Sequence, residues 1–128
     1  MLDYFTIYRC ILEVIHDEHV TDAFELFEFL SSKEELYEMR EIFPKNLMAE
    51  ATLEVLDNLI DDGLVIAKRL PTSDITLYQI QRLSTAGYSY LHALEKPEIK
   101  EKAINFLKTE GMPLTPQSLT KALANLFL

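Results

Sequence analysis

The chain has 128 residues, 48% of them hydrophobic, with only 3 Gly and 5 Pro, which suits one packed domain and argues against disorder. Its formal net charge of −9 excludes a uniformly basic nucleic-acid binder. The charge is uneven, because residues 1–62 carry 16 acidic and 4 basic residues whereas residues 63–128 carry 5 and 8. We therefore expect one end that repels polyanions and one that attracts them weakly.

The sequence indicates neither export nor membrane insertion. Its longest unbroken apolar run, 64–67, is far too short to span a bilayer, and the N-terminus lacks the basic flank and apolar core of a signal peptide. The single cysteine, Cys10, excludes an intramolecular disulfide and fits a reducing compartment. We therefore expect a cytoplasmic protein.

Hydrophobic spacing predicts two helices at the start of the chain. The first covers 3–18 with Asp3 as its cap. Its apolar residues occupy about half of the helix surface, so it should contact two neighbours or a second subunit. Asp22 and Glu25 have the spacing of a capping box before a short second helix. The apolar face of this short helix comprises Phe24, Phe27 and Leu30.

A third short helix and a longer one are predicted next. Ser32 and Glu35 repeat the capping-box spacing, and Pro44 ends the short helix. Asn46 is the expected cap of a helix over 47–62. The buried side of this longer helix should comprise Met48, Thr52, Val55, Leu56, Leu59 and Ile60.

After this helix the periodicity changes to that of a β-hairpin. Gly63 can adopt the left-handed conformation that ends a helix. Strands are predicted over 64–70 and 75–83, separated by a Pro-Thr-Ser-Asp turn. Tyr78 and Ile80 should share one face of the returning strand.

Three more helices are expected after the hairpin. Ser84 or Thr85 should start the first and Pro97 should limit it, and the second should cover 98–110. The stripe of the first comprises Tyr88, Leu91 and Leu94. The last helix carries an apolar side that must either fold back over the domain or pair with a second chain, and we predict a homodimer. This predicted interface comprises Leu119, Leu123, Leu126 and Phe127.

The order of helix, helix, helix, two-stranded wing and helix is that of a winged helix-turn-helix. The segment LDNLIDDGLV at 56–65 looks like a third helix entering the wing, and LSTAGYSYL at 83–91 resembles the L-T-x-x-G-x-x-F/Y-L segment that follows the wing in many members. With its small size and extra C-terminal helices, the chain resembles the YjcQ-like winged-helix proteins of Gram-positive bacteria and their phages. The resemblance covers about 3–110.

This resemblance implies a mainly α fold, a winged helix-turn-helix with a two-stranded β-wing and extra C-terminal helices, in a phage or prophage setting. We expect a winged-helix domain over 1–95. The remainder, 96–128, should be a helical extension that packs on the domain or on a second subunit.

The third main helix carries an acidic stripe on the side opposite its apolar face. The stripe comprises Glu50, Glu54, Asp57 and Asp61. No Lys or Arg lies within 47–62. Winged-helix proteins that bind DNA place this helix between two phosphate walls, which four carboxylates oppose. Three interpretations stay open: a solvated face, a protein-binding or DNA-mimicking surface, or insertion into the major groove.

The basic residues suggest a weak alternative contact with DNA. Lys68 and Arg69 lie near the hairpin tip and Arg82 on the returning strand, where they can contact phosphates or simply protect strand edges from aggregation. A mild basic patch follows, comprising Lys96, Lys100, Lys102 and Lys108.

No motif points to catalysis, a cofactor or a metal. His16-Asp17-Glu18-His19 has histidines at helical spacing but no further ligand cluster, and Cys10 has no implied base. We therefore expect a non-enzymatic protein. One hypothesis is a phage-type regulator that contacts DNA weakly through the wing and the basic C-terminal half. The other is an acidic module that binds a basic surface of a host or phage protein.

Overall fold

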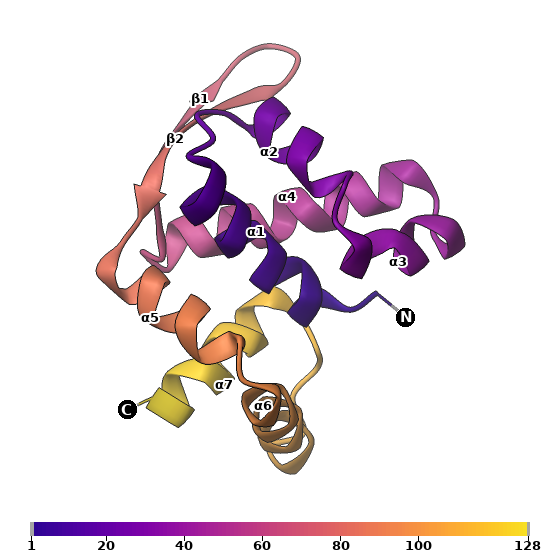
Figure 1. Cartoon of the computed structure of the whole chain (residues 1–128), viewed down its shortest axis with the longest axis vertical. Helices are drawn as coiled ribbons and strands as arrows, with labels where there is room; N and C mark the ends of the chain where they lie inside the picture. The colour runs from indigo at the N-terminus through magenta and orange to yellow at the C-terminus, as the bar shows by residue number, and fades with distance from the viewer. Residues whose placement is uncertain (1, 128) are drawn as a thin grey trace.

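The computed structural model describes residues 2–127, with only the backbone of Phe127 (Figure 1). Its elements, in chain order, are α1 (Tyr4–Glu18), α2 (Ala23–Leu30), a 3₁₀ turn η1 (Glu34–Leu36), α3 (Tyr37–Ile42), α4 (Lys45–Asp61), β1 (Val65–Pro71), β2 (Thr76–Leu83), α5 (Thr85–Leu94), α6 (Pro97–Thr109) and α7 (Pro116–Phe127). The predicted fold class is confirmed: a winged helix-turn-helix with a two-stranded wing and additional C-terminal helices.

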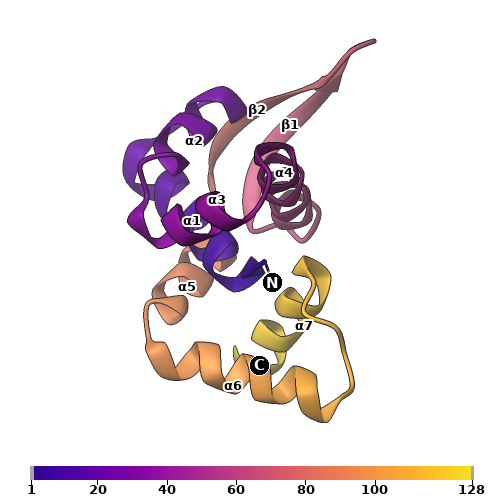
Figure 2. The same ribbon diagram turned by 90° about the vertical axis from the view of Figure 1, so that its right-hand side faces the viewer.

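The wing is an antiparallel hairpin that runs from Val65 opposite Leu83 to Pro71 opposite Thr76. An irregularity of the register lies between Ile66 and Ala67, near the base of the hairpin. The connection between α1 and α2 also joins the sheet, because the backbone N–H of Ile80 donates to the carbonyl of Thr21 at 2.8 Å. The hairpin is thus held at its base, and its tip projects away from the C-terminal helices (Figure 2).

Local sequence signals position several helix ends. The side chains of Asp3, Asp22 and Ser84 cap α1, α2 and α5, and each accepts a hydrogen bond from a backbone N–H in the first turn, as predicted. Gly63 has φ of 75°, which confirms the left-handed residue expected between α4 and the wing.

Two predicted caps are wrong. Asn46 does not cap α4, because the helix begins at Lys45 directly after Pro44 and has no side-chain cap. Ser32 does not cap the next helical segment, because its hydroxyl donates to the carbonyl of Phe29 at 2.9 Å and so closes the end of α2. A side-chain oxygen can satisfy either of two adjacent helix ends, and spacing alone does not choose between them.

Helix α5 approaches the base of the wing more closely than its predicted stripe suggests. Tyr88, expected in that stripe, is 52% exposed, whereas Gly87 is buried. A Cβ atom at Gly87 would lie 2.1 Å from the carbonyl oxygen of Leu64, and the Ser84 N–H donates to the same oxygen at 2.9 Å. Glycine therefore allows the helix to contact the wing backbone directly.

Helix α1 lies at the centre of the core and packs against α2, α4, α5, α7 and β2. This explains its wide apolar surface without a second subunit. The largest fully buried side chains come from both halves of the chain and include Ile7, Tyr8, Ile11, Leu26, Leu56, Leu59, Leu107, Leu119 and Leu123.

The C-terminal helices pack on the winged-helix part of the same chain. Leu119 and Leu123 are each 1% exposed and Leu126 is partly buried against the core. The prediction that Leu119 and Leu123 form a dimer interface is therefore corrected: α1, α4 and α6 already cover this side of α7. The side chain of Phe127 lies outside the described residues, and the homodimer itself stays a prediction.

A polar contact fixes α7 within this packing. The hydroxyl of Thr120 lies 3.3 Å from the hydroxyl of Tyr8 and 3.1 Å from the side-chain amide of Asn58. These three side chains come from α7, α1 and α4, so one hydrogen-bonded cluster joins the extension to two helices of the winged-helix part. Buried polar groups need such partners.

Candidate protein-interaction face

The acidic stripe of α4, made of Glu50, Glu54, Asp57 and Asp61, lies on the outer side of the helix. Glu50, Glu54 and Asp61 are exposed and Asp57 is half-buried. The other side of the helix buries Val55, Leu56 and Leu59. The predicted separation of an acidic surface from an apolar one is therefore confirmed.

Arg69 of the wing contacts the stripe directly. Its guanidinium donates to Asp57 at 3.1 Å and also to Asp61. These hydrogen bonds to the carboxylates, above all the one to Asp61 and then the one to Asp57, raise the pKa of Arg69. Arg69, one of the three residues predicted to contact DNA, is thus paired with two carboxylates of the acidic stripe. These are carboxylates that we expected to oppose DNA binding.

Tyr78 makes a second link between the wing and α4. Its hydroxyl donates to Asp57 at 2.9 Å. Burial and this hydrogen bond to a carboxylate raise the pKa of Tyr78 to about 12, so the hydroxyl keeps its proton. Arg69 and Tyr78 are opposite each other in the hairpin, and both reach the same carboxylate.

The other two predicted DNA-contacting residues are exposed but not brought together. Lys68 is opposite Gln79, midway along the hairpin, while Arg82 is opposite Ile66 near its base. Arg82 also donates to the carbonyl of Leu83 at 3.0 Å.

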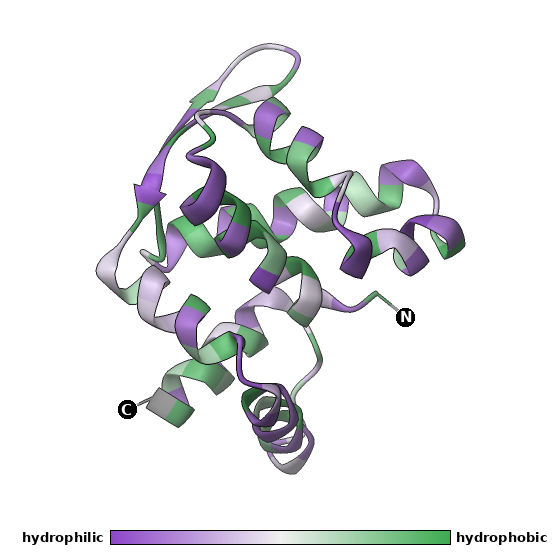
Figure 3. Ribbon diagram, in the orientation of Figure 1, coloured by the Kyte–Doolittle hydropathy of each residue, from purple (hydrophilic) through white to green (hydrophobic). Residues whose placement is uncertain are grey.

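An open hollow of about 560 Å³ lies between α2, α4 and the outer part of the hairpin. We call it the wing groove. Its apolar lining comprises Ala23, Phe24, Phe27, Leu53, Leu70, Ile75, Leu77 and the ring of Tyr78. Figure 3 shows hydrophobic ribbon on both α2 and the hairpin at this end of the molecule.

Several residues of the wing groove are more exposed than large apolar side chains usually are. Phe24 is 68% exposed, Ile75 52%, Leu70 42% and Leu77 39%. The sequence placed Phe24 on the apolar face of its helix together with Phe27 and Leu30, but only Leu30 of these is buried, and Leu26 is the other buried residue of α2. Sequence analysis therefore missed this groove. The apolar residues beside the Pro-Thr-Ser-Asp turn were the available signal.

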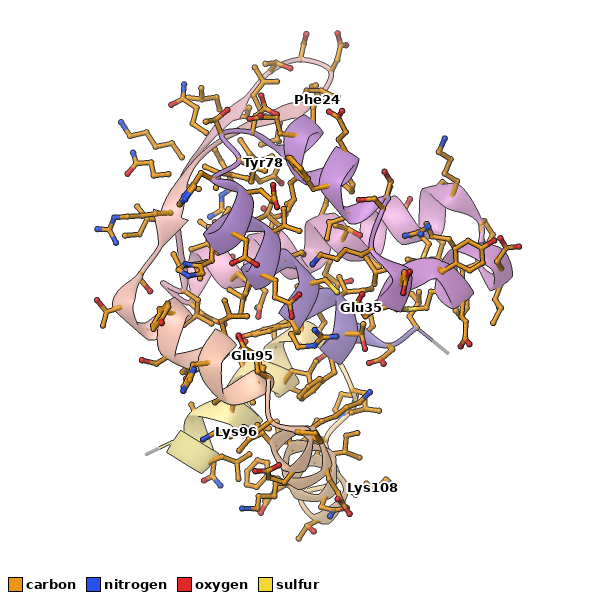
Figure 4. The ribbon with its side chains drawn as sticks, in the orientation of Figure 1. Phe24, Glu35, Tyr78, Glu95, Lys96 and Lys108 are labelled. Atoms are coloured by element: carbon orange, nitrogen blue, oxygen red, sulfur yellow. The ribbon has the colours of Figure 1, made fainter. Side chains whose placement is uncertain are left out.

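Acidic residues border the wing groove. Asp22 and Asp57 contribute to its lining, and the rest of the acidic stripe continues along α4 from Asp57. In Figure 4, Phe24 and Tyr78 lie at the same end of the molecule, opposite Lys96 and Lys108. The groove therefore combines an apolar lining with carboxylates at its border.

The remaining candidate residues have structural explanations. His16 packs edge-on against Tyr88, with ring centroids 5.1 Å apart, and His19 ends α1 in a left-handed conformation with φ of 53°. Within residues 2–127 no three His, Cys, Asp or Glu side chains are placed to hold a metal ion. Burial raises the pKa of the Cys10 thiol to about 11, which disfavours the thiolate that a nucleophile requires.

Comparisons with known proteins add no further constraint. No protein-family model, curated protein or solved structure matches this chain. The resemblance to YjcQ-like proteins therefore stays a prediction. In the described part of the chain, no helix combines the length and the apolar content that crossing a bilayer requires.

Proposed function

We propose that this protein is a winged-helix interaction module whose acidic face binds a cationic surface of another protein. The observation that carries the proposal is the pairing of Arg69 with Asp57 and Asp61. A DNA-binding wing offers its cations to phosphates, whereas this cation is already engaged by the helix that would enter the major groove.

Electrostatics supports a protein partner over DNA. After Arg69 is counted, the stripe still has an excess of negative charge, and residues 1–62 as a whole carry 16 acidic against 4 basic residues. Binding to DNA gains affinity when protein cations replace condensed counterions, and carboxylates beside phosphates have the opposite effect. An acidic surface attracts a cationic protein and accelerates its association.

A second candidate function is weak DNA contact by a phage-type regulator. The exposure of Lys68 and Arg82 supports it, as does the exposure of Lys96, Lys102 and Lys108 on the far side of the molecule. Lys68 lies midway along the hairpin, whereas Lys96 and Lys108 lie at the far end of the molecule (Figure 4), so few of these cations would reach one duplex together. The geometry therefore supports DNA contact less well than binding to a cationic protein.

Binding to oligolysine and to a mixed-sequence DNA duplex separates the two functions. We expect oligolysine to bind at low salt, and Glu50→Lys with Glu54→Lys to weaken it roughly five- to tenfold, since each exposed charge contributes about 0.2–1 kcal/mol. The matched control is Glu98→Lys with Glu101→Lys, which makes the same charge change on exposed residues of α6.

The proposal fails if both pairs of changes weaken oligolysine binding equally, because the attraction would then reflect net charge alone. It also fails if the duplex binds the wild type and Lys68→Ala with Arg82→Ala abolishes that binding. Fluorescence anisotropy across a salt series measures both ligands.

A further inference from the structure

We propose that the wing groove is the docking site for the apolar side chains of a cationic, amphipathic segment of a partner protein. This inference rests on the proposed function and adds to it the position and chemistry of the contact. The partner's apolar residues would enter the hollow between α2 and the hairpin, and its basic residues would face the acidic stripe.

Four of the large apolar side chains that are exposed in the described residues line this groove. Phe24 on α2 is distant in sequence from Leu70, Ile75 and Leu77 on the hairpin, yet all four line the same hollow. A gathering of exposed large apolar side chains around a concave surface marks interaction sites in soluble proteins.

The shape of the groove suits a protein segment better than a small molecule. Small-molecule sites enclose most of their ligand. Here the lining residues are themselves open to solvent, with Phe24 68% and Ile75 52% exposed, so a compact ligand would keep much of its surface in water. A segment that runs along the groove can cover these side chains and continue onto α4.

The charges around the groove determine which segment fits. Asp22 and Asp57 lie in the lining itself, and Glu54 and Glu50 extend the negative surface along α4. Arg69 already places a guanidinium between Asp57 and Asp61, so this surface accommodates a cation at hydrogen-bonding distance. A second copy of the chain is a poor occupant, because a twofold contact would place two acidic surfaces together.

The test uses synthetic peptides of lysine and leucine. One has leucines at helical spacing on a single side, a second has the same composition in scrambled order, and oligolysine is the third. We expect the patterned peptide to bind the wild type more tightly than the other two. Phe24→Ser with Ile75→Ser should weaken its binding at least fivefold, as expected when interface anchors are truncated.

Ile42→Ser provides the matched control, because Ile42 is 72% exposed on α3 and does not line the groove. It should leave peptide binding unchanged. Circular dichroism and thermal unfolding of each variant establish that the fold persists, which is expected because all three substituted residues are largely exposed.

The outcomes separate this inference from the proposed function. If the three peptides bind equally, and only Glu50→Lys with Glu54→Lys weakens them, the acidic face is the site and the groove inference is overturned. If no peptide binds, both are overturned. If Phe24→Ser with Ile75→Ser instead abolishes a concentration-dependent dimer in analytical ultracentrifugation, the occupant is a second copy and the inference is wrong.

Discussion

Helix α7 and the tip of the wing both carry large apolar residues, but these residues are buried on α7 and exposed on the wing. Leu119 and Leu123 of α7 are almost completely buried, whereas Leu70, Ile75 and Leu77 of the hairpin remain exposed. The difference in burial arises because α7 packs on three helices of its own chain, whereas the tip of the hairpin extends beyond the helices that pack against the hairpin (Figure 2). The leucines of α7 stabilise the fold, whereas the apolar residues on the wing remain open to solvent.

The two ends also differ in charge. The winged-helix end carries the acidic stripe and the groove, and the end formed by α6 and α7 carries exposed lysines, among them Lys96 and Lys108 (Figure 4). The exposed apolar side chains of the wing groove and the acidic stripe therefore lie together at the winged-helix end. This coincidence is more informative about function than the overall net charge.

The largest expected effect comes from truncating matched leucines at the two ends. Leu123→Ala should lower the free energy of unfolding by about 2–5 kcal/mol, because it leaves a cavity in the core. Leu77→Ala should cost less than about 1 kcal/mol, because the side chain is already 39% exposed. Urea unfolding measures both. Equal losses would show that the wing leucines are as structural as those of α7.

A smaller effect is expected where the base of the wing meets α5. Gly87→Ala should lower the free energy of unfolding by about 1–3 kcal/mol, since the added methyl would overlap the carbonyl of Leu64. Ser89→Ala, at an exposed position of the same helix, is the control and should change stability little. Thermal unfolding followed by circular dichroism measures both variants. A neutral Gly87→Ala would mean that α5 does not contact the wing backbone this closely.

The smallest effect concerns the link between the acidic and basic ends, where Lys100 donates to Asp3 at 3.1 Å. Burial raises the pKa of Asp3, but hydrogen bonds from Thr6 and the nearby Lys100 outweigh it, and the net pKa is lowered. Asp3→Ala removes the cap as well as the charge, and should cost about 0.5–2 kcal/mol near neutral pH. Asp3→Asn keeps a capping oxygen and should cost less.

The pH dependence provides an independent check on Asp3. Because its pKa is lowered in the folded state, the charged form stabilises the fold above the unfolded-state value of 3.8, and this contribution is lost as the pH falls below it. The difference between wild type and Asp3→Asn should therefore shrink below about pH 4. A difference that stays constant across this range in urea unfolding would rule out a role for the carboxylate charge.

Sequence signals predicted the fold well wherever the relevant interaction is local. The caps at Asp3, Asp22 and Ser84 and the left-handed Gly63 depend on residues within one helical turn. Tyr88 was misplaced because the spacing of apolar residues does not reveal that Gly87 contacts the backbone of Leu64. Such a close approach depends on how two distant elements dock.

Only part of the candidate site could be predicted, because the rest of it also depends on how distant elements dock. The spacing of the four acidic residues on α4 was sufficient to place them on one surface. The pairing of Arg69 with Asp57 and Asp61 was not predicted, because it depends on how the hairpin folds back toward α4. The exposure of Phe24 depends likewise on which side of α2 meets α1.

The contacts of Asp57 have a consequence for recognition. Because Asp57 holds both Arg69 and Tyr78, the hairpin and α4 are fixed relative to each other before any partner arrives. A preorganised receptor loses little conformational entropy on association, so more of the contact energy is retained as affinity. The carboxylate of Asp57, which would repel phosphates, thus also holds the hairpin against α4 and would preorganise the proposed binding surface.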